Sequence, residues 1–514
     1  MSECYLIGVG GTGSKIMENY IKLCSTGLGP DNLWIGMVDQ DEANGNVARA
    51  KTSIEKYQRL RTFIKREGKN NIGYDSNFLK TDIKTHPDDS SWCPLPGVTP
   101  TLKDVFSYDL LNPKLQDTVN CLYHPEDELN LALDEGFRAR PSIGAAAIIS
   151  QMNSETPFWQ KLFEALDEAK SGKEVKIFLV SSIFGGTGAS GFPSIARLLR
   201  EIIKQKNITS GVKIGGALML PYFSFPKPEA GEEKQVAHAD TFLEQSRGAL
   251  DYYSRMFENE EVKIFDELYV AGADPLIPLK YFEKGGNNQK NPPLLPEVYA
   301  CLAASKFFES DNINQSKIFH ISRKNVSNFY WQDLPGIKGS KTETKDLIGQ
   351  FIRTAISFKE IYYPYLSTKW QTVQNESWFQ ILIKNEGVNL SDTDMQFEIE
   401  QVKNFFDDFL EWFASLSYNS KAYEDEKIEL VKCEQYSSLN ASSKFGDVTL
   451  HDKMNKYQLA QFSDLIINSK SKTLAKVFTE MNYPEKKSNR SGFGNFLGQL
   501  YDTCKSISGE KSND

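Results

Sequence analysis

Short apolar runs that end in polar or glycine-rich turns open the chain. The run at 4–9, CYLIGV, leads into Gly10 to Gly13, and apolar residues then recur at helical spacing over 16–23. A second apolar run at 33–38, LWIGMV, ends in Asp39-Gln40-Asp41. This order predicts strand, turn, helix and strand within the first 40 residues.

The same alternation continues to about residue 310. Continuously apolar runs predict strands that are buried on both faces, at 174–183, 212–221 and 265–273. Helical spacing predicts helices between and after them, at 192–203, 236–257 and 296–308. Strands that alternate with helices indicate an α/β, Rossmann-like domain over 1–310, with a parallel sheet covered on both faces. Residues 45–125 are polar and irregular, so we expect an insertion there, with some helix at 53–66.

Beyond residue 310 the pattern becomes mostly helical. Helices are predicted at 343–358, 396–416, 456–481 and 493–505, with one candidate strand at 427–436. We therefore expect a mostly helical C-terminal domain over 311–487, then a loop, a terminal helix and a disordered tail over 488–514. An aromatic face at 402–416 fits either a packed core or a partner surface, and the core is the commoner explanation.

Composition narrows the class of protein. The chain has 514 residues, 40% of them apolar and 25% charged, which is typical of a soluble globular protein of two or three units. A net charge of −9 argues against non-specific nucleic-acid binding. The seven cysteines form no Cys-x-x-Cys pair, and the five histidines show no zinc spacing. With no signal peptide and no run of about 20 apolar residues, we expect a cytoplasmic protein without membrane insertion.

Two glycine-rich turns carry the candidate chemistry. Glycines let a backbone approach a ligand closely, and a helix that starts there directs N–H groups at an anion such as phosphate. Residues 8–13 match G-x-G-x-x-G, with Asp39 after the next strand, which is a dinucleotide-binding pattern. They are not a P-loop, because Gly13-Ser14-Lys15 reverses the required order. Gly185 to Gly188 repeats the phrase, so two turns could hold one polyphosphate; close packing of helix on strand is the alternative.

These phrases resemble those of the tubulin/FtsZ family. FGGTGAS at 184–190 is similar to the signature Gly-Gly-Gly-Thr-Gly-Ser/Thr-Gly, with Phe184 and Ser190 as departures. IGVGGTGSK at 7–15 resembles the first phosphate loop of FtsZ. Asp39-Gln40-Asp41 stands where the second loop follows the second strand, and ARPSIGAAA at 139–147 resembles the third loop. The pattern is closest to a divergent bacterial branch of the family.

The resemblance implies GTP or GDP with Mg²⁺. The α- and β-phosphates would lie on one side against Gly185, Gly186, Thr187, Gly188, Ala189 and Ser190, and on the other against Gly10, Gly11, Thr12 and Gly13. The γ-phosphate would lie near Pro141, Ser142 and Gly144. Asp39 and Asp41 would hold the metal through water, or would simply be solvated loop carboxylates.

In the family the base lies against the long helix after the sheet. Asn291 and Glu297 stand at the start of the helix at 296–308. A carboxylate that accepts N1–H and N2–H would select guanine over adenine. Capping of the helix is the alternative role for either residue.

Hydrolysis in this family is completed by a loop Asn-x-Asp-x-x-Asp/Glu from the next subunit. The nearest match, NFYWQDLPG, keeps Asn328 and Asp333 but has Tyr330 at the middle acid. The resemblance therefore implies a self-assembling GTPase, a homo-oligomer or filament, with slow hydrolysis.

Two further functions remain open. The first is a nucleotide-gated switch without filaments, with a protein partner in a bacterial stress or defence system. The second is an NAD- or ATP-using enzyme, because GVGGTGS also resembles the adenylating loop of ubiquitin-activating-type enzymes. A Cys-x-x-Cys zinc site, usual in those enzymes, is missing from this sequence.

Overall fold

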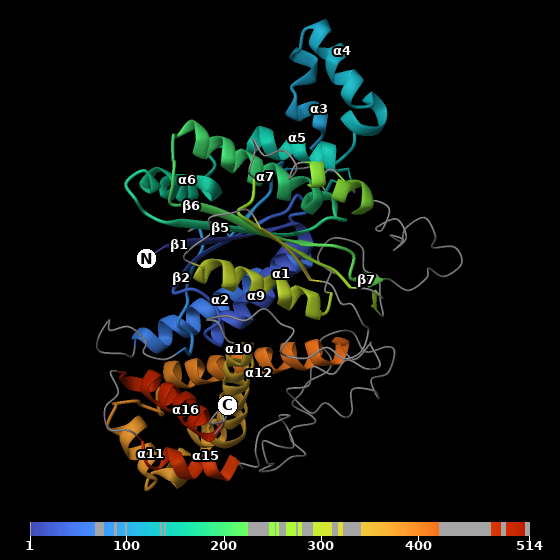
Figure 1. Cartoon of the computed structure of the whole chain (residues 1–514). Helices are drawn as coiled ribbons and strands as arrows, with labels where there is room; N and C mark the ends of the chain where they lie inside the picture. The colour runs from blue at the N-terminus through green and yellow to red at the C-terminus, as the bar shows by residue number, and fades with distance from the viewer. Residues whose placement is uncertain are drawn as a thin grey trace.

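The computed structural model shows a parallel sheet between two layers of helices, with a further group of helices beyond one layer (Figure 1). The α/β fold and the helical C-terminal region expected from the sequence are confirmed. The structure describes residues 2–66, 77–86, 90–97, 100–133, 136–137, 140–224, 246–251, 253–255, 264–273, 276–279, 291–310, 317–321, 341–420, 474–484 and 490–508.

Eight strands form the main sheet, in the order β10-β8-β6-β5-β1-β2-β3, with β4 also paired to β2. All pairs are parallel. Their bounds are Glu3–Val9 (β1), Asn32–Val38 (β2), Asp82–Lys84 (β3), Ser91–Trp92 (β4), Val175–Ser182 (β5), Val212–Met219 (β6), Glu267–Ala271 (β8) and Lys317–Ile321 (β10). Phe223–Ser224 (β7) and Ile277–Pro278 (β9) form a separate pair. Every residue of the central strand β5 is buried, as its continuous apolar run predicts.

Helices cover both faces of the sheet. On one face lie Pro141–Gln151 (α5), Pro157–Ala169 (α6) and Gly186–Gln205 (α7); on the other lie Gly10–Ser25 (α1), Gly45–Arg66 (α2) and Leu295–Glu309 (α9) (Figure 1). Parallel strands connected through helices require this arrangement. No helix in the described part of the chain is long and apolar enough to span a membrane.

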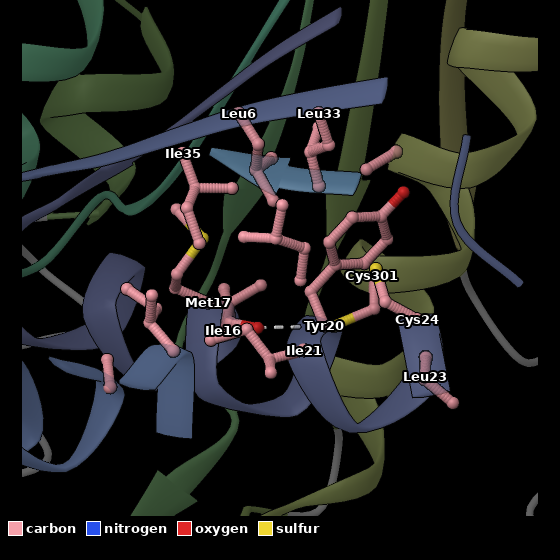
Figure 2. Close-up of a cluster of buried hydrophobic side chains, with 14 of the residues drawn as sticks. Leu6, Ile16, Met17, Tyr20, Ile21, Leu23, Cys24, Leu33, Ile35 and Cys301 are labelled. Atoms are coloured by element: carbon pink, nitrogen blue, oxygen red, sulfur yellow. Dashed lines mark hydrogen bonds between the residues drawn. The ribbon is translucent and has the colours of Figure 1, made fainter. Parts of the chain in front are cut away.

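The core beneath β1 and β2 is built around α1. Figure 2 shows side chains of α1, Ile16 and Tyr20 among them, directed at strand residues such as Leu6 and Leu33. All four are fully buried, and each such apolar side chain contributes about 1.5–3 kcal/mol. Cys301 of α9 closes the cluster, where its thiol donates to the carbonyl oxygen of Ile16 at 3.4 Å.

Residues 45–125, the expected insertion, contain elements that pack on the sheet and elements that stand away from it (Figure 1). Residues 45–66 form α2, which packs along α1, and β3 extends the sheet. The part that stands away from the sheet is an arm made of Leu102–Val105 (α3), Tyr108–Leu110 (η1), Pro113–Leu122 (α4) and Pro125–Leu129 (η2) (Figure 1). Leu110 and Leu122 of this arm are 88% and 69% exposed. The helix expected at 53–66 is the C-terminal part of α2, whose buried face carries Val47, Ile54, Tyr57 and Ile64.

Beyond residue 310, the expected domain boundary, β10 pairs with β8 in the main sheet. The C-terminal helices are Lys341–Ser357 (α10), Ser377–Phe379 (α11), Thr393–Ser420 (α12), Leu474–Met481 (α15) and Gly492–Ser508 (α16), with short turns Phe358–Tyr362 (η4), Tyr365–Lys369 (η5), Trp370–Val373 (η6) and Gln380–Lys384 (η7). The predicted strand at 427–436 and most of the helix at 456–481 lie outside the described residues.

The C-terminal helices form one group that packs against α2. Phe493 of α16 lies 5.7 Å from Phe63 of α2, measured between ring centroids, so the terminal helix packs against α2. The aromatic face of α12 is buried, with Phe409 against Phe351 of α10 at 4.4 Å. The core interpretation of that face is confirmed.

Candidate functional site

The two glycine-rich turns meet at one edge of the sheet. Strands β1 and β5 are parallel neighbours, so their carboxyl ends lie together, and α1 and α7 begin there at Gly10 and Gly186. Gly10 has φ of +74°, and a Cβ on it would lie 3.0 Å from the backbone nitrogen of Gly188. The hydroxyl of Ser181 also donates to the carbonyl oxygen of Val9 at 2.9 Å. The backbones of the two turns are therefore in direct contact.

Some of these glycines allow a helix to pack closely on a strand, and another leaves room for a ligand. A Cβ on Gly13 would lie 2.6 Å from the carbonyl oxygen of Val180, and one on Gly188 would lie 2.9 Å from that of Ser182. These two glycines let their helices pack closely on β5. Gly185 is different, because a Cβ there would meet the Ser182 hydroxyl at an ordinary 3.4 Å. Its backbone has room for a ligand.

Asp39 links the second strand to the second turn. It follows β2 and is 6% exposed, and its Oδ1 accepts a hydrogen bond from the Thr187 hydroxyl at 3.1 Å. Its Oδ2 is buried with no hydrogen-bond partner in the described structure. Burial raises the pKa of Asp39 to about 7, which the hydrogen bonds it accepts only partly oppose. A buried carboxylate with one unpaired oxygen and a raised pKa is stabilised by a nearby cation or by a proton.

The side chains of Asp41 and Gln40, in the same loop, bond to different parts of the backbone. Asp41 is buried, and its Oδ1 accepts the N–H of Ala43 at 3.1 Å. Gln40 bonds both backbone groups of Leu95, donating to its oxygen at 2.8 Å and accepting from its nitrogen at 3.0 Å. Within the part of the chain that the structure describes, no group of three or more Asp, Glu, His or Cys side chains could hold a metal alone. A metal here would need ligands from a bound molecule or water.

The third loop lies against the second turn. Pro141 occupies the first turn of α5, as predicted, and Ser142 beside it is exposed. A Cβ on Gly144 would collide with Ser190, which bonds the carbonyl oxygens of Gly186 and Thr187 at 2.8 and 3.1 Å. The structure therefore brings together the three predicted loops, while the Ser190 hydroxyl serves its own helix.

Glu297 has four donors inside the protein. It is fully buried, and its carboxylate pairs with Lys15 at 2.5 Å. It also accepts from Tyr222 and Asn19, both at 2.8 Å, and from the backbone N–H of Leu294 at 3.0 Å. The capping alternative is thus confirmed. Because a carboxylate has about four acceptor positions, a base would have to displace one of these donors; base recognition by Glu297 stays a prediction.

Asn291 lies beside residues that sequence reasoning missed. Its carbonyl oxygen accepts from Arg49 Nη2 at 3.2 Å, and the same nitrogen donates to Asn46 Oδ1 at 3.1 Å. A Cβ on Gly11 would lie 2.9 Å from Asn44 Nδ2 and 3.4 Å from Asn46 Nδ2. The position of these amides, soon after the acidic loop at 39–41, was the available signal. The predicted catalytic pair, Asn328 and Asp333, lies outside the described residues.

Comparisons with solved structures find only weak similarity. CetZ from Methanosaeta thermophila strain DSM 6194 is 14% identical over 53% of this chain and 46% of that chain, with a TM-score of 0.23. A GTPγS-form protofilament of Bacillus thuringiensis serovar israelensis TubZ gives 14% identity over 60% of this chain and 56% of that chain, with a TM-score of 0.22. This chain thus spans about half the length of each. Values this low define neither its fold nor its function.

Sequence families give a clearer result. No curated protein matches the chain. Residues 123–263, however, match the model of a family described as "Tubulin like". That segment contains the third loop, β5, the second glycine-rich turn and α7. The resemblance to the tubulin/FtsZ-like family is therefore confirmed over residues 123–263, the segment that supplies the Gly-Gly-Thr-Gly turn.

Proposed function

We propose that the chain is a tubulin-like GTP-binding protein that self-assembles and hydrolyses GTP slowly at a site completed between subunits. The contact between the two glycine-rich turns is the observation that carries this proposal. Each turn starts a helix, and helix N-termini bind phosphate through backbone N–H groups and the helix dipole. Two of them at one point of the sheet edge suit a polyphosphate. The tubulin-like match of residues 123–263 favours GTP or GDP as that ligand.

Unpaired buried atoms support a ligand at this place. Ser14 Oγ, one turn into α1, and Asp39 Oδ2 are buried without a hydrogen-bond partner among the described residues. Native proteins leave few such atoms, and a bound ion or water is one explanation of an exception. A nucleotide with its metal ion would provide donors, acceptors and a cation beside these two side chains.

Asp39 and Asp41 would hold Mg²⁺ through water. Mg²⁺ keeps several waters and usually combines one or two carboxylates with phosphate oxygens, so two acids are enough. The ion would neutralise charge on the phosphates. Thr187 would hold Asp39 Oδ1 in place, as it does in the structure at 3.1 Å, and backbone groups of Gly185 and Gly186 would face the phosphates.

Hydrolysis would depend on the neighbouring subunit. Asn328 and Asp333 would reach the terminal phosphate of the next molecule near Pro141 and Ser142, and would position water there. Tyr330 replaces the middle acid of this loop, which fits slow turnover.

A nucleotide-gated switch without filaments is the second candidate. The apolar residues that the arm exposes, Leu110, Leu115 and Leu122, favour it because they offer a surface for another protein. The guanidinium of Arg140 joins the arm to the start of α5 by donating to the carbonyl oxygen of Asp127 at 2.6 Å. A change at the third loop would thereby reach the arm.

Phosphate release from GTP, over a hundredfold range of protein concentration with ATP as control, tests these proposals. Specific activity that rises with concentration and then levels off supports a site completed between subunits. Constant specific activity favours the switch. Binding of ATP or NAD in preference to GTP contradicts both and favours a Rossmann-type enzyme.

A further inference from the structure

The arm carries an exposed apolar face. No residue of α4 is buried, and Leu115 and Leu122 of this helix are both exposed. They are seven residues apart, which is about two turns of helix, so they lie on the same face of α4. Leu110, shortly before the helix, is also exposed, and the arm stands away from the helices that cover the sheet (Figure 1). The leucine face of α4, Leu115 with Leu122, is therefore accessible to another molecule.

The arm is also acidic. Residues 101–129 contain six Asp or Glu residues and two Lys residues, so their net charge is −4. Asp117 lies between the two leucines in the sequence, and its side chain is exposed, as is that of Glu126. Lys103, one of the two lysines, pairs with Asp109 at 3.0 Å. A surface that complements this arm would be apolar and would carry basic groups at its edge.

A pocket beneath α6 has an apolar wall of this kind. It lies over the middle of β1 and β2 and has about 400 Å³ of empty space, counting its open mouth. Trp34 stacks on Tyr5 with ring centroids 6.3 Å apart, and the ring of Phe158 packs on Gly36. Trp34 and Phe158 are only half-buried, so the pocket is accessible from the surface.

The edge of this pocket is basic. Lys161 of α6 and His86 line it, and no acidic residue is among the described residues that do so. Lys161 is exposed and pairs with Glu164, one turn further along α6, at 2.6 Å. Pairs between exposed side chains contribute little, so an incoming carboxylate can replace Glu164 at this lysine. The pocket therefore has the apolar wall and the basic edge that complement the arm.

We propose that the arm of one molecule docks in this pocket of a second copy of the chain. Leucine side chains of α4 enter between Trp34 and Phe158, and acidic side chains of the arm lie near Lys161. The arm, over α5, and the pocket, beneath α6, are on the same face of the sheet (Figure 1). Two copies that face each other can therefore exchange arms in a symmetric pair. This contact goes beyond the proposed function, because it uses neither glycine-rich turn and needs no nucleotide.

Photo-crosslinking of the unmutated chain tests which surfaces meet. Cys121 is an exposed cysteine of α4, about 100° around the helix from Leu122, so a benzophenone attached to it lies beside the leucine face. In a mixture of isotopically light and heavy protein, we expect crosslinks between this label and α6 or β2 of a different copy. The same reaction on Cys121→Ser is the control. Crosslinks that join only two arms, or none between copies, would overturn the proposal.

Sedimentation of the nucleotide-free protein tests the pairing of arm with pocket. An arm variant, Leu115→Ser with Leu122→Ser, and a pocket variant, Trp34→Ala with Lys161→Glu, should each self-associate about tenfold more weakly than the wild type. Mixing the two variants should restore a complex, because the intact pocket of one receives the intact arm of the other. Leu250→Ser, at an exposed leucine outside the arm, is the matched control and should associate like the wild type.

The outcomes separate this proposal from the proposed function. A wild-type protein that stays monomeric without nucleotide overturns the proposal, and so does a pocket variant that associates like the wild type. In that second case the arms pair with each other. Both variants should bind GTP with wild-type affinity, since neither changes a glycine-rich turn. If the wild-type protein binds no nucleotide, the proposed function fails, while the contact between arm and pocket is still decided by crosslinking and sedimentation.

Discussion

The two glycine-rich turns are nearly identical in sequence and lie in different surroundings. The first, at Gly10 to Gly13, starts a helix whose side chains reach α2, α9 and the C-terminal helices. The second, at Gly185 to Gly188, starts a helix that packs on α5 and reaches Asp39 through Thr187. The helix of the first turn is thus joined to Glu297 and α9, and the second turn is joined to Asp39.

The connection of the first turn continues into the C-terminal half. Asn19 of α1 donates to Glu297 at 2.8 Å and accepts from the indole nitrogen of Trp412, in α12, at 2.6 Å. Lys15 of the same helix pairs with Glu297. The helix of the first turn therefore touches both the crossover helix α9 and the helical group beyond it. In α7, by contrast, Arg200 donates to the carbonyl oxygen of Ile264 at 2.7 Å and pairs with Asp266, just before β8. We therefore expect coupling between nucleotide and C-terminal helices to pass through the first turn.

Breaking the Glu297 network is expected to have the largest effect. Glu297→Ala leaves Lys15 buried without its partner, and removing one member of a buried pair costs about 3–5 kcal/mol. Thermal or urea unfolding should show this loss. Glu398→Ala is the control, since its partner Arg59 is exposed and surface pairs contribute about 0–1 kcal/mol. A loss from Glu297→Ala no larger than that of the control would mean that the first turn is not anchored through this carboxylate.

The pH dependence of stability tests Asp39, the acid that contacts the second turn. Burial raises the pKa of Asp39 to about 7, whereas an unfolded Asp titrates near 3.9. Between these values the folded protein holds a proton that the unfolded chain has released. The stability of the nucleotide-free protein should therefore fall as pH rises from about 4 to 7 and then level off, by up to about 4 kcal/mol in total.

Asp39→Asn should remove this slope and make the nucleotide-free protein more stable at pH 8, while weakening the binding of magnesium and GTP. Urea unfolding at intervals from pH 4 to 8 measures the slope. Asp117→Asn, at an exposed position of α4, is the matched control and should leave the slope of stability against pH unchanged. An unchanged slope in Asp39→Asn would show that another group causes it.

The strands, helices and loops of the site could be predicted from the sequence, whereas the contacts between distant side chains could not. The buried strands, such as β5, and the helices that start at glycine leave local patterns in the sequence, and so do the three loops. The partners of Glu297 do not, because Asn19 and Lys15 are separated from it by more than 270 residues. The contacts of Arg49 are equally hidden, because Asn291 is more than 240 residues away and only the fold brings it and Glu18 to this side chain.

The contact between the turns can be tested at Gly10. Gly10→Ala introduces a Cβ at positive φ and 3.0 Å from the backbone of Gly188. Gly172→Ala imposes similar backbone strain, at φ of +90°, but with nothing within 4 Å of the new atom. Both variants should lose about 1–2 kcal/mol of stability. Only Gly10→Ala should also weaken GTP binding, by about tenfold or about 1.4 kcal/mol; equal affinities in isothermal titration would contradict the shared phosphate site.

The smallest effect is expected at Thr187, and it decides what the hydroxyl does. Thr187→Val removes the donor to Asp39, a bond that contributes about 1 kcal/mol, while Thr187→Ser keeps it. Because this bond lowers the pKa of Asp39, its loss should extend the pH-dependent fall in stability to higher pH in the nucleotide-free protein. If the curve of Thr187→Val matches that of Thr187→Ser while GTP binding weakens, the hydroxyl serves the phosphate rather than the acid. The second turn would then resemble the first in binding the ligand directly. The two turns would differ only in the contacts of the helices that follow them, α1 and α7.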